Sequence, residues 1–332
     1  MYAACMPVRG FARGTICDLE RNKLDIVSNE LIEVIEECDQ HSLDDVFQAY
    51  GDDNRQVLQS YIDWLLANEY AFKTTTPERF PKLEIEYQRP EVITNALIDV
   101  NKHSNHDFSS ISKSLDALGC KDIQVRLFDY LNITSLLEIV SAFDETGIKS
   151  VELLCQYSDE ISENEIQRIC QSFPRVYLLV VHSSPFLKEI PGRSDSLSTM
   201  GNILYTTQKI VSEDHCGLIR PSQFSINTET YLESKNFNSC LNQKISIDVD
   251  GVIKNCPSMR FGYGSISEIS LEEVATLPEF QRIWHINKDQ IKVCRDCEFR
   301  YICTDCRAYA EGDSPTGKPS KCNYDPYTAT WS

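Results

Sequence analysis

The chain has 332 residues, of which 42% are hydrophobic and 10% aromatic, so it can bury a sizeable core as one large domain or several smaller ones. Its formal net charge of -18, with no basic patch in the sequence, repels phosphate backbones and argues against a nucleic-acid partner. No apolar run approaches the length of a membrane-spanning helix, and the segment MYAACMPVRGFARG lacks the apolar region of a secretory signal. We therefore expect a cytoplasmic protein with no membrane partner.

The number and distribution of cysteines point to metal binding or reactive thiols. The chain contains 14 cysteines, and the cytoplasm keeps thiols reduced, which argues against a disulfide scaffold. Seven of them are scattered singly up to residue 216, whereas the other seven lie between residues 240 and 322. We expect the metal in this second, denser segment.

Residues 1–80 have the pattern of strands followed by helices. GTICDLERNKLDIV alternates polar and apolar residues around Arg21-Asn22, which predicts a β-hairpin. SNELIEVIEEC begins with a Ser28 cap and has helical spacing, RQVLQSYIDWLLANEY predicts another helix, and AFKTT predicts a short extended segment. A hairpin with three helices is typical of a winged helix. We expect a winged-helix-like domain that either docks another protein or binds a peptide by strand addition at the hairpin edge.

Residues 90–229 show a repeated strand–helix pattern after the proline-containing linker TTTPERFPKLEIEYQRPE. Five segments predict strands: ITNALIDV (93–100), DIQVRLF (122–128), SVELLCQ (150–156), VYLLVV (176–181) and NILYTT (202–207). The first four are separated by the helical patterns FSSISKSLDALG, SLLEIVSAFDETG and ENEIQRICQSF. A strand roughly every 26 to 30 residues, each followed by a helix, indicates βα units on a parallel sheet. This α/β segment is too small for a closed eight-stranded barrel, so we expect a partial barrel or an open sheet.

The pattern changes again from about residue 230. ISIDVDGVIK predicts a hairpin around Asp250-Gly251, and SLEEVATLPEFQRIW predicts a helix that begins at a Ser270 cap. The remainder is a cysteine-rich loop with poor strand periodicity. Something other than a hydrophobic core must order it.

The segment VCRDCEFRYICTDCRAYAEG, residues 293–312, contains four cysteines as C-x2-C-x5-C-x2-C. A zinc ribbon separates its cysteine pairs by roughly 15 to 20 residues so that two hairpins can face each other. Thiolates interleaved at short range are common in iron–sulfur proteins, whose cluster is larger than one ion. The spacing therefore favours iron–sulfur clusters, with zinc as the alternative. The full set of seven is Cys240, Cys256, Cys294, Cys297, Cys303, Cys306 and Cys322.

The arrangement of these cysteines resembles the SPASM domain, which binds auxiliary iron–sulfur clusters in radical SAM enzymes that modify peptides. It comprises Cys240, Gly251-x4-Cys256, the four-cysteine segment and Cys322. KISIDVDGVIKNCPSM, CEFRYICTDCRAYAEG and CNYDPYT resemble more narrowly the SPASM peptide maturases of the grasp-with-spasm type, which are encoded beside an ATP-grasp peptide ligase and a short precursor peptide. CMPVRGFARGTICDLERNKLDIVSNELIEVI resembles that family too. The likeness implies a degenerate, radical-SAM-like partial barrel over residues 90–229 and a SPASM iron–sulfur domain over residues 230–332.

The resemblance implies two [4Fe-4S] clusters with interlocked ligands. The first would be held by Cys240, Cys256 and Cys306, and the second by Cys294, Cys297, Cys303 and Cys322. The first then lacks a fourth cysteine, because residues 241–255 contain none. Cys216, with His215 beside it, is the best remaining candidate. The alternatives are a loop cysteine with no ligand role and an open iron site for a substrate.

The sequence lacks the C-x3-C-x2-C motif that holds the S-adenosylmethionine-reducing cluster of radical SAM enzymes. In the family this motif follows the first barrel strand, whereas the corresponding loop here reads NKHSNHDFSS. It contains His103 and His106 as H-x2-H without an evident third ligand, so we expect a solvated loop. Radical SAM activity is not expected, and whether the protein is an enzyme stays open.

Three functional hypotheses follow. The first is a maturation factor that binds a precursor peptide, its ATP-grasp peptide ligase, or both. No glycine-rich phosphate loop is present, so the ATP chemistry would belong to the partner. The second is a redox-active peptide-modifying enzyme that uses the auxiliary clusters. The third is a metal-stabilised scaffold without a peptide role.

Overall fold

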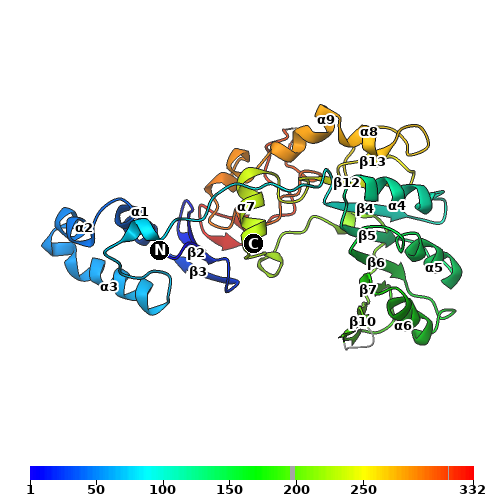
Figure 1. The fold of residues 1–332 in the computed structure, drawn as a ribbon, viewed down its shortest axis with the longest axis horizontal. Helices are drawn as coiled ribbons and strands as arrows, with labels where there is room; N and C mark the ends of the chain where they lie inside the picture. The colour runs from blue at the N-terminus through cyan, green and yellow to red at the C-terminus, as the bar shows by residue number, and fades with distance from the viewer. Residues whose placement is uncertain (195–198, 313) are drawn as a thin grey trace. The chain divides into compact units, whose positions relative to one another are not determined.

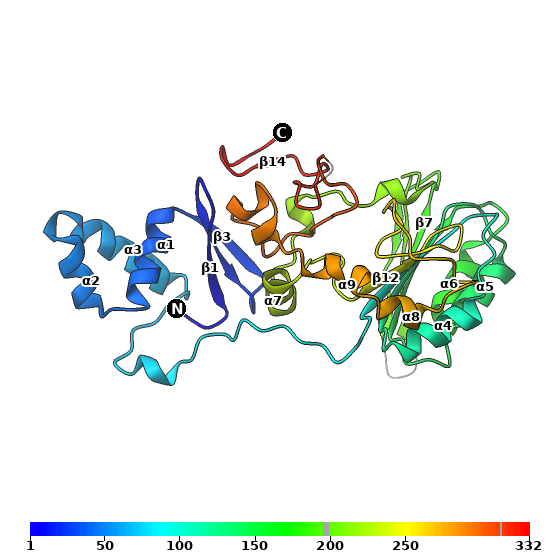
Figure 2. The same cartoon turned by 90° about the horizontal axis from the view of Figure 1, so that it is seen from above.

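The protein has an α/β fold with a mixed eight-stranded sheet, described here by a computed structural model that covers residues 1–194, 199–312 and 314–332 (Figures 1 and 2). The chain forms two compact units. The first unit comprises Met1–Tyr87, Leu218–Ser239 and His285–Ser332, and the second comprises Gln88–Gly217 and Cys240–Trp284. The segment 230–332, expected to be one domain, thus contributes to both units. The three functional domains expected from the sequence stay a prediction.

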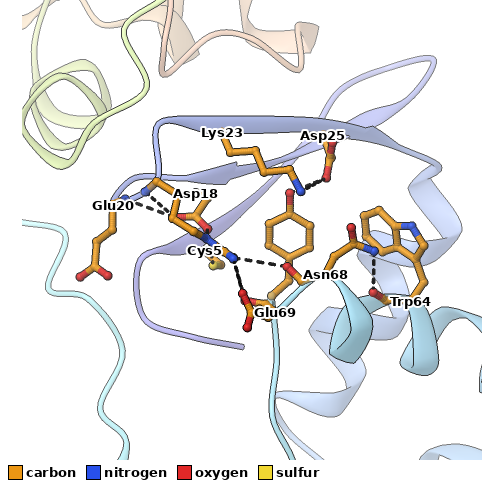
Figure 3. Close-up of polar contacts among 10 residues, drawn as sticks. Cys5, Asp18, Glu20, Lys23, Asp25, Trp64, Asn68 and Glu69 are labelled. Atoms are coloured by element: carbon orange, nitrogen blue, oxygen red, sulfur yellow. Dashed lines mark hydrogen bonds and ion pairs between the residues drawn. The ribbon is translucent and has the colours of Figure 1, made fainter.

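The first unit begins with an antiparallel sheet in the order β1-β2-β3. Its strands are β1 (Cys5–Arg9), β2 (Gly14–Asp18) and β3 (Lys23–Val27). The predicted hairpin is confirmed, with Asn22 in the left-handed conformation at φ 51° that asparagine tolerates. Asp18 closes this turn by accepting the backbone N–H groups of Glu20 and Arg21 at 3.2 and 3.0 Å (Figure 3).

Two helices, α1 (Asn29–Cys38) and α3 (Arg55–Ala67), pack against one face of this sheet, and α2 (Leu43–Tyr50) packs against these two helices (Figure 2). The predicted Ser28 cap is confirmed, and Ser42 forms a capping box with Asp45. The core on this face consists of Cys5, Ile16, Val27, Leu31, Ile32, Ile35, Leu65 and Tyr70. The expected extended segment AFKTT forms no strand.

The opposite face of the same sheet packs against the cysteine-rich part of the chain. This second core contains Val8, Cys17, Leu19, Tyr231, Phe299, Tyr301, Ile302 and Tyr324. Approach is close at Gly10, where an added Cβ would lie 2.8 Å from the backbone nitrogen of Glu298. Residues 1–80 therefore share a core with residues near the C-terminus, which sequence periodicity alone does not reveal.

The second unit is built on the eight-stranded sheet, in the order β13-β12-β4-β5-β6-β7-β11-β8. The five predicted strands are confirmed as β4 (Asn95–Val100), β5 (Asp122–Leu127), β6 (Ser150–Gln156), β7 (Val176–His182) and β11 (Asn202–Tyr205). The predicted helices are α4 (Phe108–Ala117), α5 (Ile133–Ser141) and α6 (Glu163–Ser172). Figure 1 shows all three on one face of the sheet, as right-handed crossovers between strands added in sequential order require.

The sheet is larger than the five βα strands because other segments join its edges. β12 (Lys244–Ile247) pairs in parallel with β4, and β13 (Ile253–Lys254) pairs antiparallel with β12. The predicted hairpin around Gly251 is therefore part of the main sheet. Ile245 and Ile247 of β12 belong to the same core as the buried residues of α4. At the other edge, β8 (Lys188–Ile190) pairs antiparallel with β11.

The expected single helix after Ser270 is two short helices, α8 (Leu271–Ala275) and α9 (Pro278–Gln281). Pro278 starts the second because proline has no N–H to continue the first. The other elements are α7 (Thr228–Asn236), β9 (Arg193–Ser194), β10 (Thr199–Met200), β14 (Tyr324–Asp325), β15 (Thr330–Trp331) and 3-10 turns at Asp52–Asn54, Pro77–Arg79, Glu213–His215, Pro221–Gln223, Arg282–His285, Lys288–Gln290 and Cys294–Asp296. Within the residues described, none of the helices has the length and apolar character needed to cross a bilayer.

Candidate functional site

The four cysteines expected to hold the second cluster all belong to the first unit. Burial is the main cause that raises the pKa of Cys294 to about 12, and the Cys303 thiol adds to it. Cys303 likewise adds to the raised pKa of Cys297, and Cys322 adds to that of Cys303, with burial again the main cause. Burial and the neighbouring thiols therefore both oppose ionisation of Cys294, Cys297 and Cys303, and a cation or a metal would compensate the charge of their thiolates.

Short backbone turns position these thiols. The N–H of Cys297 donates to the carbonyl of Cys294 at 3.0 Å, and the N–H of Phe299 donates to the sulfur of Cys297 at 3.4 Å. Val293, just before the first cysteine, has φ 68°, a conformation that a β-branched residue rarely adopts. An N–H donated to sulfur stabilises a thiolate, as around cluster ligands.

Three buried charges surround this thiol group, and sequence reasoning did not identify them. Lys288 is only 3% exposed, and its ammonium donates to the carbonyl of Thr304 at 3.0 Å. Burial acts to lower the pKa of Lys288, but Cys303 and the neighbouring acidic groups outweigh it, so the pKa is raised. Lys288 thus keeps its positive charge beside the thiols.

The other two charges are Asp305 and Arg307, which flank Cys306. Asp305 is fully buried and accepts from the Arg307 guanidinium at 2.9 Å and from the Asn238 amide at 2.7 Å. The sequence shows charged residues between the cysteines, but it does not show which of these charges are buried and which are exposed to solvent. Only the packing identifies this pair.

The cysteines around the first expected cluster are divided between the units. Cys216, Cys240 and Cys256 belong to the second unit, whereas Cys306 is a buried residue of the first. Burial is the main cause that raises the pKa of Cys256 to about 12, and both Cys240 and Cys216 add to it. The ammonium of Lys244 lies 3.8 Å from the sulfur of Cys240.

A hydrogen bond joins the loops that carry two of these cysteines. The hydroxyl of Ser258, two residues after Cys256, donates to the carbonyl of Glu213, three residues before Cys216, at 3.3 Å. Cys216 is exposed at the end of this 3-10 turn. The structure therefore brings the candidate ligand Cys216 toward Cys256, and its role as a ligand stays a prediction.

Over residues 1–194, 199–312 and 314–332, no three or more His, Cys, Asp or Glu side chains form a ready site for one metal ion. The donor set consists of thiols with N–H groups beside them and two cations, the buried Lys288 and the half-buried Lys244. Such a set suits a thiolate-ligated group with a negative charge to compensate. This donor set fits both an iron–sulfur cluster and zinc.

A buried ion pair lies at the carboxyl ends of β4 and β5. Arg126 donates to both oxygens of Asp99 at 2.6 and 2.7 Å, and both side chains are at least 94% buried. Burial raises the pKa of Asp99 to about 6 in spite of the pair. Cys216 and Cys256 are among the groups that raise the pKa of Arg126 against the effect of burial. The guanidinium is therefore a second cation near this thiol group.

The loop after β4 does not assemble a histidine pair. His103 is exposed, whereas the Nε2 atom of His106 lies 2.9 Å from the carbonyl oxygen of Asp99. One histidine is therefore bound to the backbone and the other faces solvent. Cys155 and Cys170, predicted to be core residues, are buried in the main core, as expected.

No protein-family model and no curated protein matches this chain significantly. The resemblance to SPASM peptide maturases therefore stays a prediction from the residues quoted above.

Proposed function

We propose that this chain is a SPASM peptide maturase of the grasp-with-spasm type, a maturation factor for a ribosomally synthesised peptide. It binds the precursor peptide, its ATP-grasp peptide ligase, or both, and carries two [4Fe-4S] clusters. The observation that carries the proposal is the close spacing of the cysteines in the sequence together with the cations beside them. Cys294, Cys297, Cys303 and Cys322 belong to the first unit, as does the buried Lys288, and Cys216, Cys240 and Cys256 belong to the second unit, where the ammonium of Lys244 lies beside Cys240.

The order of the main sheet supports a degenerate partial barrel related to radical SAM enzymes. β4, β5, β6, β7 and β11 follow one another in sequential parallel order, with their helices on one face. A β/α barrel is built by this repeat, whereas a doubly wound sheet reverses direction and covers both faces. The loop after β4 contains no cysteine, so S-adenosylmethionine cleavage is not part of the proposal.

The chain's own residues would hold the clusters and adjust their charge. Cys294, Cys297, Cys303 and Cys322, with Lys288 beside them, would ligate one cluster. Cys240, Cys256 and Cys306 would ligate the other, with Cys216 as the candidate fourth ligand. When bound, such clusters supply rigidity and a one-electron carrier. Lys288, Lys244 and Arg126 would offset the negative charge of the thiolates.

The winged-helix-like part of the first unit offers an edge for peptide binding. β3 pairs only with β2, and within the described residues its backbone makes no hydrogen bond to any other segment. Ile26 on this strand is 51% exposed. Lys23 and Asp25 form a 2.9 Å ion pair beside the hydroxyl of Tyr70 (Figure 3). An open edge with an apolar side chain is suited to strand addition by a precursor peptide.

The cluster proposal is tested by the iron and acid-labile sulfide content of anaerobically purified protein. We expect about eight of each per chain, as two cubanes require. Cys303→Ala should lose about half of the iron, whereas Cys38→Ala, at a half-buried cysteine of α1 that is not a proposed ligand, should lose none. Zinc without sulfide would contradict the proposal and favour the metal-stabilised scaffold.

The role of Cys216 has a separate test. Cys216→Ala should lower the iron content in part if this thiol ligates the first cluster. Unchanged iron and an unchanged electron paramagnetic resonance spectrum would remove it from the ligand set.

The peptide role is tested by point variants, because deletion of residues 1–80 would uncover the core that they share with Phe299 and Tyr324. Ile26→Lys should weaken binding of the precursor peptide by about tenfold, because it places a desolvated charge in the added ladder. Val57→Lys, at a 52% exposed position of α3 away from the edge, is the matched control. Equal affinity in both variants would rule out the β3 edge.

The redox alternative requires a new product. If reconstituted protein with reductant changed the mass of the precursor beyond what the ligase alone produces, the chain would be an enzyme rather than a binding factor.

A further inference from the structure

A cavity of about 210 Å³ lies at the carboxyl ends of β6 and β7, beside the first turn of α6. Its buried wall includes Ile166, Val181 and Tyr205, which are at most 4% exposed. A drug-sized ligand needs a pocket of roughly 300 Å³ or more, so this one is suited to a single long side chain. None of the proposed cluster ligands and no residue of β3 lines it, and all of its lining residues belong to the second unit.

Three aromatic rings line the cavity. The ring of Phe186 lies 5.9 Å from that of Tyr157 and 5.4 Å from that of Tyr205. Phe186 is 40% exposed although it sits between two other rings. An exposed phenyl ring flanked by two tyrosines presents aromatic faces to a ligand, and aromatic faces attract cations.

Tyr205, which lines the cavity, is 97% buried as a residue.

The rim of the cavity is acidic. The segment from Gln156 to Glu165 contains four carboxylates and no lysine or arginine. Glu163 lies at the rim and forms a 2.6 Å ion pair with Lys188, in which both side chains are about 40% exposed. Asp159, also at the rim, accepts the hydroxyl of Tyr157 at 2.7 Å. An ion pair this exposed contributes little to stability, so an ammonium or guanidinium from outside can take the place of Lys188.

We propose that this cavity binds the side chain of a lysine or arginine residue of a peptide, with the stem among the three rings and the cation at Glu163 and Asp159. The inference rests on the proposed function only for the source of that side chain, which would be the precursor peptide. Charge complementarity and the aromatic lining select a basic side chain over an acidic one.

The test uses two small probes and the full-length holoprotein. Nα-acetyl-lysine methylamide and its uncharged counterpart Nα-acetyl-norleucine methylamide are titrated by calorimetry or by ligand-detected nuclear magnetic resonance. We expect saturable binding of the lysine probe, about tenfold tighter than the norleucine probe. Iron content is measured on every sample, so a failure of the cluster proposal is recognised separately from a failure here.

Four variants test which side chains contribute to the affinity for the lysine probe. Glu163→Gln and Phe186→Ala should each weaken the lysine probe by about fivefold, whereas Lys188→Met should tighten it because the competing ammonium is gone. Glu160→Gln is the control, because this carboxylate lies on the same loop but bonds to Tyr130 outside the cavity. Equal affinity for the two probes, no saturable binding, or no gain in Lys188→Met would overturn the proposal.

Discussion

Asp18 illustrates how one residue can close a turn and connect it to a helix. Its carboxylate accepts from the backbone of Glu20 and Arg21, from the Arg21 guanidinium and from the Cys5 thiol. Arg21 in turn donates to Glu69, two residues after the end of α3 (Figure 3). Burial acts to raise the pKa of Asp18, but the bonds from Arg21 outweigh it and the pKa is lowered.

We expect Asp18→Asn to lower the free energy of unfolding by about 1–3 kcal/mol at neutral pH. Because the pKa in the folded state lies below the unfolded value of about 3.9, the contribution of the carboxylate is fully present above the unfolded value and is lost as the pH falls from there through the lower pKa of the folded state. Urea unfolding should show the gap between wild type and variant shrink steadily as the pH falls below about 5. Asp44→Asn, at an exposed position of α2, should show no such gap. A gap that does not change with pH would contradict this role.

Lys288 is the residue on which the proposed second cluster depends most after its own ligands. It is a buried cation among Cys294, Cys303 and Asp305. We expect Lys288→Met to weaken retention of that cluster by about tenfold or more, since groups next to the ligands typically matter to this extent. Iron retained after dialysis against a chelator measures the effect. Lys292→Met, on the same segment, is the control, and equal iron in both variants would show that Lys288 has only a packing role.

At the scale of elements, Gly10 determines how closely the hairpin of β1 and β2 approaches the cysteine-rich segment. An added Cβ would lie 2.6 Å from the carbonyl oxygen of Arg13 and 2.8 Å from the nitrogen of Glu298. Both neighbours are backbone atoms, which cannot rotate away. The N–H of Phe11, next in the chain, donates to the carbonyl of Asp296 at 2.8 Å.

We therefore expect Gly10→Ala to destabilise the first unit by about 1–3 kcal/mol, as overpacking of a closed interface does. Gly51→Ala is the comparison, since Gly51 has φ 75° but no heavy atom within 4 Å of the added Cβ. That variant reports the backbone conformation alone, which costs about 1 kcal/mol. Thermal unfolding of both separates the two effects, and an equal loss would mean that the close approach can relax.

At the scale of the whole molecule, each unit is assembled from segments far apart in the sequence. The first combines the N-terminus, residues 218–239 and the C-terminus, and the second inserts β12 and β13 beside β4. Local unfolding of the cysteine-rich segment should therefore destabilise the N-terminal sheet as well, because Val8, Cys17 and Tyr324 belong to one core.

Removal of the metal should make this connection measurable. After oxidation and chelation, we expect amide hydrogen exchange to rise at least tenfold in β1 and β2 as well as in residues 294–322, because they form one cooperative unit. α5, which packs in the core of the second unit, should keep its protection. Faster exchange confined to the cysteine segment would show that the sheet folds without it.

The turns, helix caps and strands could be predicted from the sequence because each depends on residues that are close together in the chain. The turn at Asn22, the caps at Ser28 and Ser270, and the apolar strand-like runs of β4 to β7 depend on residues within one element, and all are as expected. The spacing of the cysteines likewise identified the segment in which Cys294, Cys297 and Cys303 interact.

Only the tertiary structure decided which distant segments meet. β12 joins β4 across about 150 residues, Phe299 packs on the N-terminal sheet, and Arg126 pairs with Asp99 between strands. A single sequence contains no periodic signal for such contacts, because they depend on which apolar faces and charges remain to be buried once the elements have formed. The sequence by itself determined the elements and the thiol segment, and packing determined the partners and the buried charges.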